Sequence, residues 1–240
     1  MKRLLIAVLI IFSLVPSAGA SELWIILLDL SKSVGEPTSG TPLWRNLVDI
    51  DNVIRSAGKE TTIFVIGFGK KSEARLLRAV MPKQAGPQEK FLKAIREAAV
   101  QKLKQNLGNR LENIDRSATD CHGALLRAER ILDEAKGENG KAMPIKKLMV
   151  YSDMLDNQTF RLSLRALSAT TQEQLAKRFN GKSFGLPELK GVDVYCRSAI
   201  LDSSEVNTRQ FEIAVKNLKA FWTQYFQRTN GRLVEYKTLY

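Results

Sequence analysis

The chain has 240 residues, of which 44% are hydrophobic and 26% are charged. This balance is typical of a globular protein and excludes fibrous and disordered classes. Lysine and arginine number 37 against 25 acidic residues, which gives a formal net charge of +12. Two cysteines and one histidine exclude a zinc site made of cysteines alone and any site built on several histidines.

Residues 1–20 have the pattern of a secretory signal peptide. Two basic residues precede an almost unbroken apolar run over residues 4–15, and the small residues 18–20 match a cleavage site. The mature chain is expected to begin near Ser21, and an uncleaved N-terminal anchor is the alternative. We therefore expect an exported protein, periplasmic or extracellular, with a single domain over residues 21–240 and no later membrane-spanning segment.

Export would place Cys121 and Cys196 in an oxidising compartment, where a disulfide is allowed. Two separate buried thiols are the alternative. We favour the disulfide, because an exported domain with only two cysteines usually has no other use for them.

Apolar runs rich in Val, Ile and aromatic residues predict strands that are covered on both faces. Four such runs cover residues 23–28, 62–68, 148–151 and 192–196. Residues 74–81 are expected to add a short edge strand, and residues 232–240 are either a last strand or a tail. Residues 137–144 have the composition of a loop.

Helices are predicted between these strands, where apolar residues recur at helical spacing. Thr41 is a capping residue with Pro42 at the first helical position, and Thr171 with Gln174 predicts a capping box. The apolar stripes run over residues 43–54, 91–103, 124–132 and 211–225, with a short helix over 171–179. Alternation of strands and helices predicts one α/β domain with a mostly parallel sheet.

Candidate metal ligands follow the first predicted strand. Asp29, Ser31 and Ser33 are spaced two residues apart where this strand turns into a loop. Carboxylate and hydroxyl oxygens are hard ligands that suit Mg²⁺, Mn²⁺ or Ca²⁺. Residues 117–120, with hydroxyls at Ser117 and Thr119, precede a predicted helix, and Asp153 ends a later buried strand, so three separate segments can converge on one cation at the carboxyl ends of the strands.

This order of residues resembles the von Willebrand factor type A (vWA) domain with its metal-ion-dependent adhesion site. The resemblance covers residues 22–231 and rests on the Asp-x-Ser-x-Ser motif, the loop threonine and the aspartate that closes a hydrophobic strand. It implies a doubly wound sheet with helices on both faces and a metal at the tips of the first and fourth strands. The chain departs from the family at Met154, where a glycine usually stands, and Ser117 is an alternative to Thr119.

The resemblance also implies roles for these residues. Ser31, Ser33 and Thr119 would bind Mg²⁺ or Mn²⁺ directly, and Asp29 and Asp153 would act mainly through water. An Asp or Glu carboxylate from a partner protein would complete the metal's coordination. The chain would thus be a metal-dependent protein-binding module, not an enzyme.

Trp44 and His122 are possible peripheral contacts to such a partner. For both residues the alternative is a structural role, in which Trp44 packs in the core and His122 caps or lines its helix.

The main enzyme alternative is a phosphatase similar to haloacid dehalogenases, with Asp29 as nucleophile and Ser152, Asp153 and Asp156 beyond a later strand. Against it, the second acid that such enzymes use for proton transfer is Ser31 here. A phosphate-binding P-loop is excluded, because Phe64 stands where its first glycine is needed.

A third alternative is a basic protein that binds anionic polymers or an anionic surface. Its candidate residues form two modest clusters, Lys102, Lys104 and Arg110, and Lys141, Lys146 and Lys147. Scattered, solvated charge is the simpler interpretation, because no run of aromatic residues accompanies the clusters.

Overall fold

The computed structural model describes residues 21–70, 73–83, 89–135, 143–179, 185–199 and 206–239. The predicted signal peptide lies outside these residues, and so does most of the predicted loop over 137–144. Within the described part of the chain, no helix is both long and apolar enough to cross a membrane.

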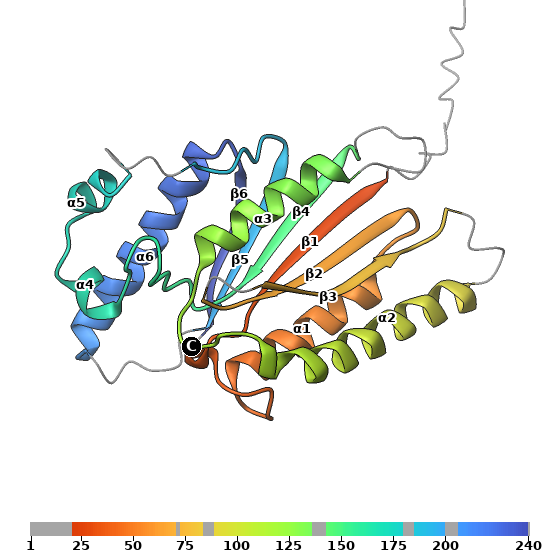
Figure 1. The fold of residues 1–240 in the computed structure, drawn as a ribbon. Coiled ribbons are helices and arrows are strands. Elements are labelled where there is room, and N and C mark those ends of the chain that lie inside the picture. The colour runs from red at the N-terminus through yellow and green to blue at the C-terminus, as the bar shows by residue number, and fades with distance from the viewer. Residues whose placement is uncertain are drawn as a thin grey trace, which may run out of the picture.

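Six strands form one sheet in the order β3-β2-β1-β4-β5-β6 (Figure 1). All neighbouring strands run parallel except β3, which pairs antiparallel with β2 at one edge. The strands are β1 Glu22–Asp29, β2 Thr61–Phe68, β3 Glu73–Val80, β4 Ile145–Tyr151, β5 Val192–Ala199 and β6 Arg232–Leu239. The four predicted central strands are confirmed, the expected edge strand is β3, and the C-terminal segment is a strand.

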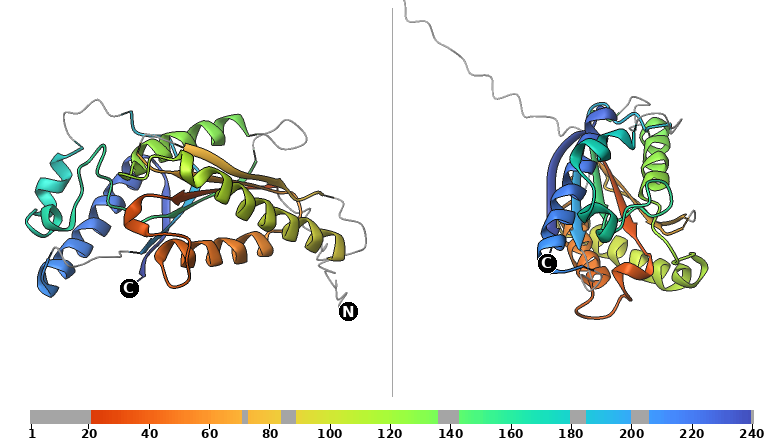
Figure 2. Two further views of the ribbon diagram at one scale, coloured as in Figure 1. Left: turned by 60° about the horizontal axis from the view of Figure 1, so that its bottom comes forward. Right: turned by 90° about the vertical axis from the view of Figure 1, so that its left-hand side faces the viewer.

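Helices cover both faces of the sheet (Figures 1 and 2). One face carries α1 Pro42–Ser56 and α2 Glu89–Arg110, and the other carries α3 Cys121–Glu134 and α6 Thr208–Arg228. The remaining helices are short: η1 Lys32–Val34, η2 Leu111–Asn113, α4 Leu164–Ser168 and α5 Gln172–Lys177. The doubly wound α/β architecture that the resemblance implied is therefore confirmed.

The alternation of side chains along β1 divides the core into two parts. Leu23, Ile25 and Leu27 pack with α3 and α6, whereas Ile26 and Leu28 pack with α1 and α2. Because successive side chains of a strand point to opposite faces, a strand that is covered on both sides needs apolar residues at every position. This explains why the strand was recognisable as a continuous apolar run.

The helices begin where capping side chains satisfy their first backbone N–H groups. The Thr41 hydroxyl accepts from the backbone N–H of Trp44, and Pro42 follows at the first helical position. Thr171 and Gln174 form the expected capping box at the start of α5. Sequence analysis did not predict α4, whose five residues are too few to show a helical stripe.

Candidate functional site

The candidate site lies at the carboxyl ends of β1 and β4, which are neighbours in the middle of the sheet. The strand order reverses between these two strands, because β2 and β3 lie on one side of β1 whereas β4, β5 and β6 lie on the other. Loops leave such a reversal point on opposite sides of the sheet, and ligands of doubly wound proteins bind in the space between them.

Asp29 ends β1 and connects the loop after β1 with the loop after β4. Its side chain is fully buried, and its Oδ1 accepts a hydrogen bond of 2.8 Å from the backbone N–H of Ser31. Its Oδ2 accepts a bond of 2.6 Å from the Ser152 hydroxyl, which follows β4. The Asp29 carboxylate therefore holds the Ser31 loop against the end of β4.

Three hydroxyl groups meet at the loop that follows Asp29. Ser31 Oγ and Ser33 Oγ lie 2.8 Å apart, and the Thr119 hydroxyl donates to Ser31 Oγ at 3.0 Å. Ser31 and Thr119 are buried, whereas Ser33 is exposed, so the group opens to solvent at Ser33. The alternative residue, Ser117, is exposed, and its N–H donates to Asp115.

Asp153 completes the group from the end of β4. Its Oδ1 accepts from the backbone N–H of Leu155 at 2.9 Å, and its carboxyl group is hydrogen-bonded to the Ser33 side chain. Burial and the nearby Asp29 carboxylate raise the pKa of Asp153 to about 7. Burial also raises the pKa of Asp29, although its hydrogen bonds to Ser152 and Ser31 oppose the shift.

All five predicted ligand residues therefore come together from three loops. Among the described residues, no three His, Cys, Asp or Glu side chains form a metal-binding group. The donor set here has a different composition, with three hydroxyls and two buried carboxylates. Hard oxygen donors of this kind fit Mg²⁺ or Mn²⁺. Two buried carboxylates beside each other also favour a positive ion between them.

Met154 adopts the backbone conformation that a glycine would adopt easily. Its φ angle is 61°, in the left-handed region, and its side chain is fully buried. The Met154 N–H donates to Ser152 Oγ, and its carbonyl accepts from the indole N–H of Trp222, each at 2.9 Å. These two bonds and the burial of the side chain offset the backbone strain, so the turn forms without the glycine that is usual at this position in von Willebrand factor type A domains.

Sequence analysis missed Asn157, which fixes the Thr119 loop. The Asn157 side-chain oxygen accepts from the backbone N–H of Thr119 at 3.0 Å, and the backbone N–H of Asn157 donates to the Thr119 carbonyl at 3.2 Å. The position of the Thr119 hydroxyl therefore depends on a residue 38 positions later in the chain. An asparagine in a loop after a strand carries no signal of such a role.

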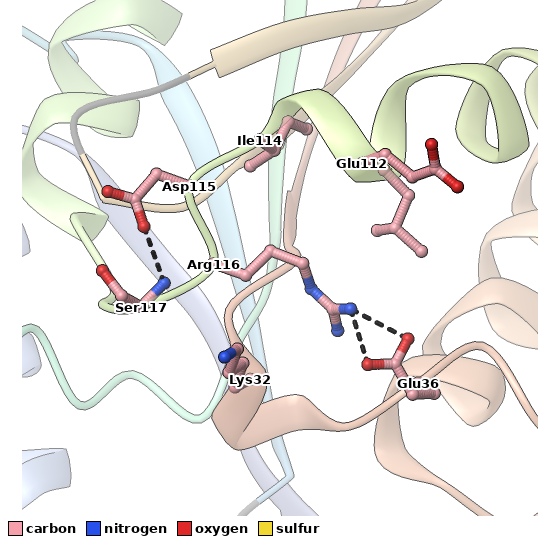
Figure 3. A pocket seen from close by; sticks show the side chains of 8 residues that line it. Lys32, Glu36, Glu112, Ile114, Asp115, Arg116 and Ser117 are labelled. Carbon is pink, nitrogen blue, oxygen red and sulfur yellow. Dashed lines mark hydrogen bonds and ion pairs between the residues drawn. The ribbon is translucent and has the colours of Figure 1, made fainter.

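Arg116 is a second residue that sequence analysis missed. Its guanidinium donates to the carbonyls of Leu30 and Gly35, on either side of the Ser31 loop, at 2.6 and 2.7 Å. It also pairs with Glu36, as Figure 3 shows, and its own carbonyl accepts from the N–H of Lys32. These contacts connect the loop after β1 to the loop before α3, which carries Thr119.

Asp156 and His122 support the site from inside the core. The buried Asp156 carboxylate accepts from three backbone N–H groups, those of His122, Thr159 and Phe160, at 2.8 to 3.0 Å. The His122 ring is buried and hydrogen-bonded to the Tyr225 hydroxyl. His122 therefore lines its helix, as the structural alternative predicted, whereas Trp44 is 39% exposed on α1 instead of packing in the core.

The disulfide favoured by sequence analysis is wrong, because Cys121 and Cys196 are both free and buried. The Cys121 sulfur lies 3.5 Å from the Ser152 hydroxyl, at the loop after β4. Cys196 lies within β5, in register with Val150 of β4 and Tyr236 of β6. The two thiols thus have separate neighbours, and burial raises the pKa of each.

We expect neither thiol to react with a thiol-labelling reagent in the folded protein, because burial hides the sulfur and disfavours the thiolate. In concentrated guanidinium chloride without reductant, both should react. Mass spectrometry of the labelled chain gives the number of modified cysteines. A chain that carries no label after denaturation would show that the thiols are bonded.

Each of the two basic clusters suggested by the sequence contains a lysine that forms an ion pair. Lys104 pairs with Asp51, and Lys147 pairs with Glu22 while lying 4.8 Å from the centre of the Trp24 ring. Lys141 lies outside the described residues. These pairings favour solvated, partly neutralised charge at both clusters.

No family model matches the chain, and no curated protein matches it. Among solved structures, the conserved hypothetical protein BatB from Bacteroides thetaiotaomicron shares 13% identity, with a TM-score of 0.48 and coverage of 92% of both chains. A von Willebrand factor type A structure from Catenulispora acidiphila shares 15% identity, with a TM-score of 0.45, over 88% of this chain and 42% of that one. The manganese-loaded TRAP protein of Plasmodium vivax shares 14%, with a TM-score of 0.39, over 83% and 63%.

Likeness of this degree carries no conclusion about metal or partner. The topology of the chain indicates where the site lies, because β1 and β4 flank the point at which the strand order reverses and carry Asp29 and Asp153 at their ends. The strand order and the meeting of the Asp29, Thr119 and Asp153 loops agree with the doubly wound fold and the site position that the resemblance to the von Willebrand factor type A domain implied.

Proposed function

We propose that the protein is a metal-dependent protein-binding module that holds Mg²⁺ or Mn²⁺ at the ends of β1 and β4. The observation that supports this function most strongly is the meeting of three hydroxyls from two loops, with Ser31 Oγ 2.8 Å from Ser33 Oγ and 3.0 Å from Thr119 Oγ1. A cation placed among these oxygens would replace the hydrogen bonds between them. Asp29 and Asp153 would supply the negative charge.

The exposure of each ligand suggests how a partner would approach. Ser31, Thr119 and both aspartates are buried, and only the Ser33 side is open to solvent. With neutral hydroxyls as the direct ligands and the two aspartates acting mainly through water, the ion still attracts a further carboxylate, and Mg²⁺ keeps water at unfilled positions of its octahedral shell. An Asp or Glu carboxylate of a partner protein would displace such a water and bind the ion. In this proposal the module acts after export, as residues 1–20 suggest.

A phosphatase mechanism with Asp29 as nucleophile is disfavoured. Asp29 is fully buried, and both of its carboxylate oxygens accept hydrogen bonds, from Ser31 and from Ser152. A nucleophile needs a free oxygen within reach of its substrate. The Asp156 carboxylate is occupied by three backbone N–H groups, which leaves it unsuited to hold Mg²⁺.

Calorimetric titration of Mg²⁺ and of Mn²⁺ into the protein tests the metal site. We expect one saturable site in the parent, with affinity reduced about tenfold or more in Ser31→Ala and in Asp153→Ala, in line with the loss of one metal ligand or of its support. Ser56→Ala is the matched control, because the Ser56 hydroxyl donates to the Val53 carbonyl at the far end of α1. If Ser31→Ala and Asp153→Ala bind metal as tightly as the parent, the proposed site is wrong.

A further inference from the structure

A pocket of about 380 Å³ lies on the α3 face of the sheet, between α3 and the edge strand β3. Its floor is formed by β2 with Phe64 and its neighbours, and it shares no lining residue with the candidate metal site. Arg75 and Arg78 enter from β3, and Arg127 and Glu134 enter from α3. Small-molecule sites have volumes from about 300 to 1,000 Å³, so the pocket has the size of a small ligand site.

The pocket has more positive than negative charge. Among the described residues that line it, three have guanidinium groups and one, Glu134, has a carboxylate. Arg127 has a loose contact of 3.7 Å with Glu73 outside the lining, and in the described part of the chain Arg75 and Arg78 form no ion pair. The pocket therefore attracts an anion.

Two structural roles account for part of this arrangement. Charged residues on an edge strand prevent pairing with another chain, and long arginine stems cover apolar surface. The Arg78 guanidinium lies 5.8 Å from the centre of the Phe64 ring, which agrees with the second role. Arg127 adds a third guanidinium group from a different element, and its contact with Glu73 is loose at 3.7 Å.

Guanidinium groups match phosphate and carboxylate oxygens, to which they donate pairs of parallel hydrogen bonds. Phe64 lines the same pocket and gives it an apolar, aromatic wall. We propose that the pocket between α3 and β3 binds the phosphate or carboxylate group of an anionic ligand through Arg75, Arg78 and Arg127. This site is independent of the proposed metal site.

The test is a calorimetric titration of phenyl phosphate and of inorganic phosphate, in the presence of EDTA so that metal-dependent binding does not contribute. We expect saturable binding to the parent, weakened about tenfold in Arg75→Gln/Arg78→Gln because charge-assisted hydrogen bonds to the anion are lost. Arg45→Gln/Arg209→Gln is the matched control: it removes the same charge from exposed positions on α1 and α6. Arg127→Gln is a second test if the first pair lowers the stability of the fold.

A second arm separates two sources of the anionic group. Sedimentation with vesicles of phosphatidylglycerol and phosphatidylcholine in equal parts detects binding to a lipid headgroup. Binding that phenyl phosphate competes away supports the site with a headgroup as its ligand, and phosphate binding without vesicle binding supports it with a free anion. The proposal is overturned if no probe binds, if the control pair weakens binding as much, or if the arginine variants bind like the parent.

Discussion

Asp156→Ala is expected to lower the free energy of unfolding by about 3 kcal/mol, because three backbone N–H groups, two of them in buried hydrogen bonds, lose their acceptor. One of these is the N–H of His122, in the first turn of α3, where no intrahelical partner exists. The other two belong to Thr159 and Phe160, in the segment after β4. Burial disfavours the charged form of Asp156 and raises its pKa, so removal of the carboxyl group relieves part of that cost and offsets part of the loss.

Urea denaturation followed by circular dichroism measures this change. Asp193→Ala is the control, because Asp193 forms a surface ion pair with Arg232, whose side chain is 75% exposed. Pairs of that kind contribute about 1 kcal/mol or less. Equal losses of stability in Asp156→Ala and Asp193→Ala would contradict a supporting role for the Asp156 carboxylate.

Arg116→Met is expected to lower both the stability and the affinity for Mg²⁺ or Mn²⁺. The Arg116 side chain is 12% exposed, and its guanidinium donates to the carbonyls of Leu30 and Gly35. Hydrogen bonds from a charged group contribute about 1.5 to 3 kcal/mol each, so we expect a total loss of about 3 kcal/mol. Because these bonds hold both ends of the loop that carries Ser31 and Ser33, metal affinity should also fall about tenfold.

The control for Arg116→Met is Arg96→Met. Arg96 also donates to a backbone carbonyl, that of Ala57, and pairs with a glutamate, Glu89, but it lies on α2 away from the candidate site. The Arg96→Met variant should lose stability and keep the metal affinity of the parent. Calorimetry with Mn²⁺ and urea denaturation of both variants separate the two effects. A metal affinity that falls equally in both variants would show that Arg116 acts only through overall stability.

The strands could be predicted because the run of apolar residues that forms each one lies within a few neighbouring positions of the sequence. A strand covered on both faces needs apolar side chains at successive positions, and residues 23–28 and 62–68 have them. The capping residues Thr41 and Thr171 were predictable for the same reason, since a cap and its N–H partner are three residues apart. The five candidate ligands could be chosen because their order along the chain resembles a known motif and because the strands and the helix beside them could be recognised.

The support of these ligands could not be predicted, because it comes from contacts between distant parts of the chain. Asn157 reaches the Thr119 loop, and Trp222 holds the Met154 turn from a helix 68 positions later. The sequence indicated that the family's glycine is absent at Met154, but only the surrounding contacts show how the left-handed turn is held.

The sequence by itself thus determined the α/β class, the central strands and the choice of oxygen donors at the ends of β1 and β4. The tertiary structure decided that Thr119, and not Ser117, meets Ser31, and that Cys121 and Cys196 stay apart. It also brought Arg75, Arg78 and Arg127 to one pocket. The physical reason is the range of the interactions: hydrophobic periodicity and capping act within a few residues, whereas packing and hydrogen bonding between loops depend on the order of strands in the sheet.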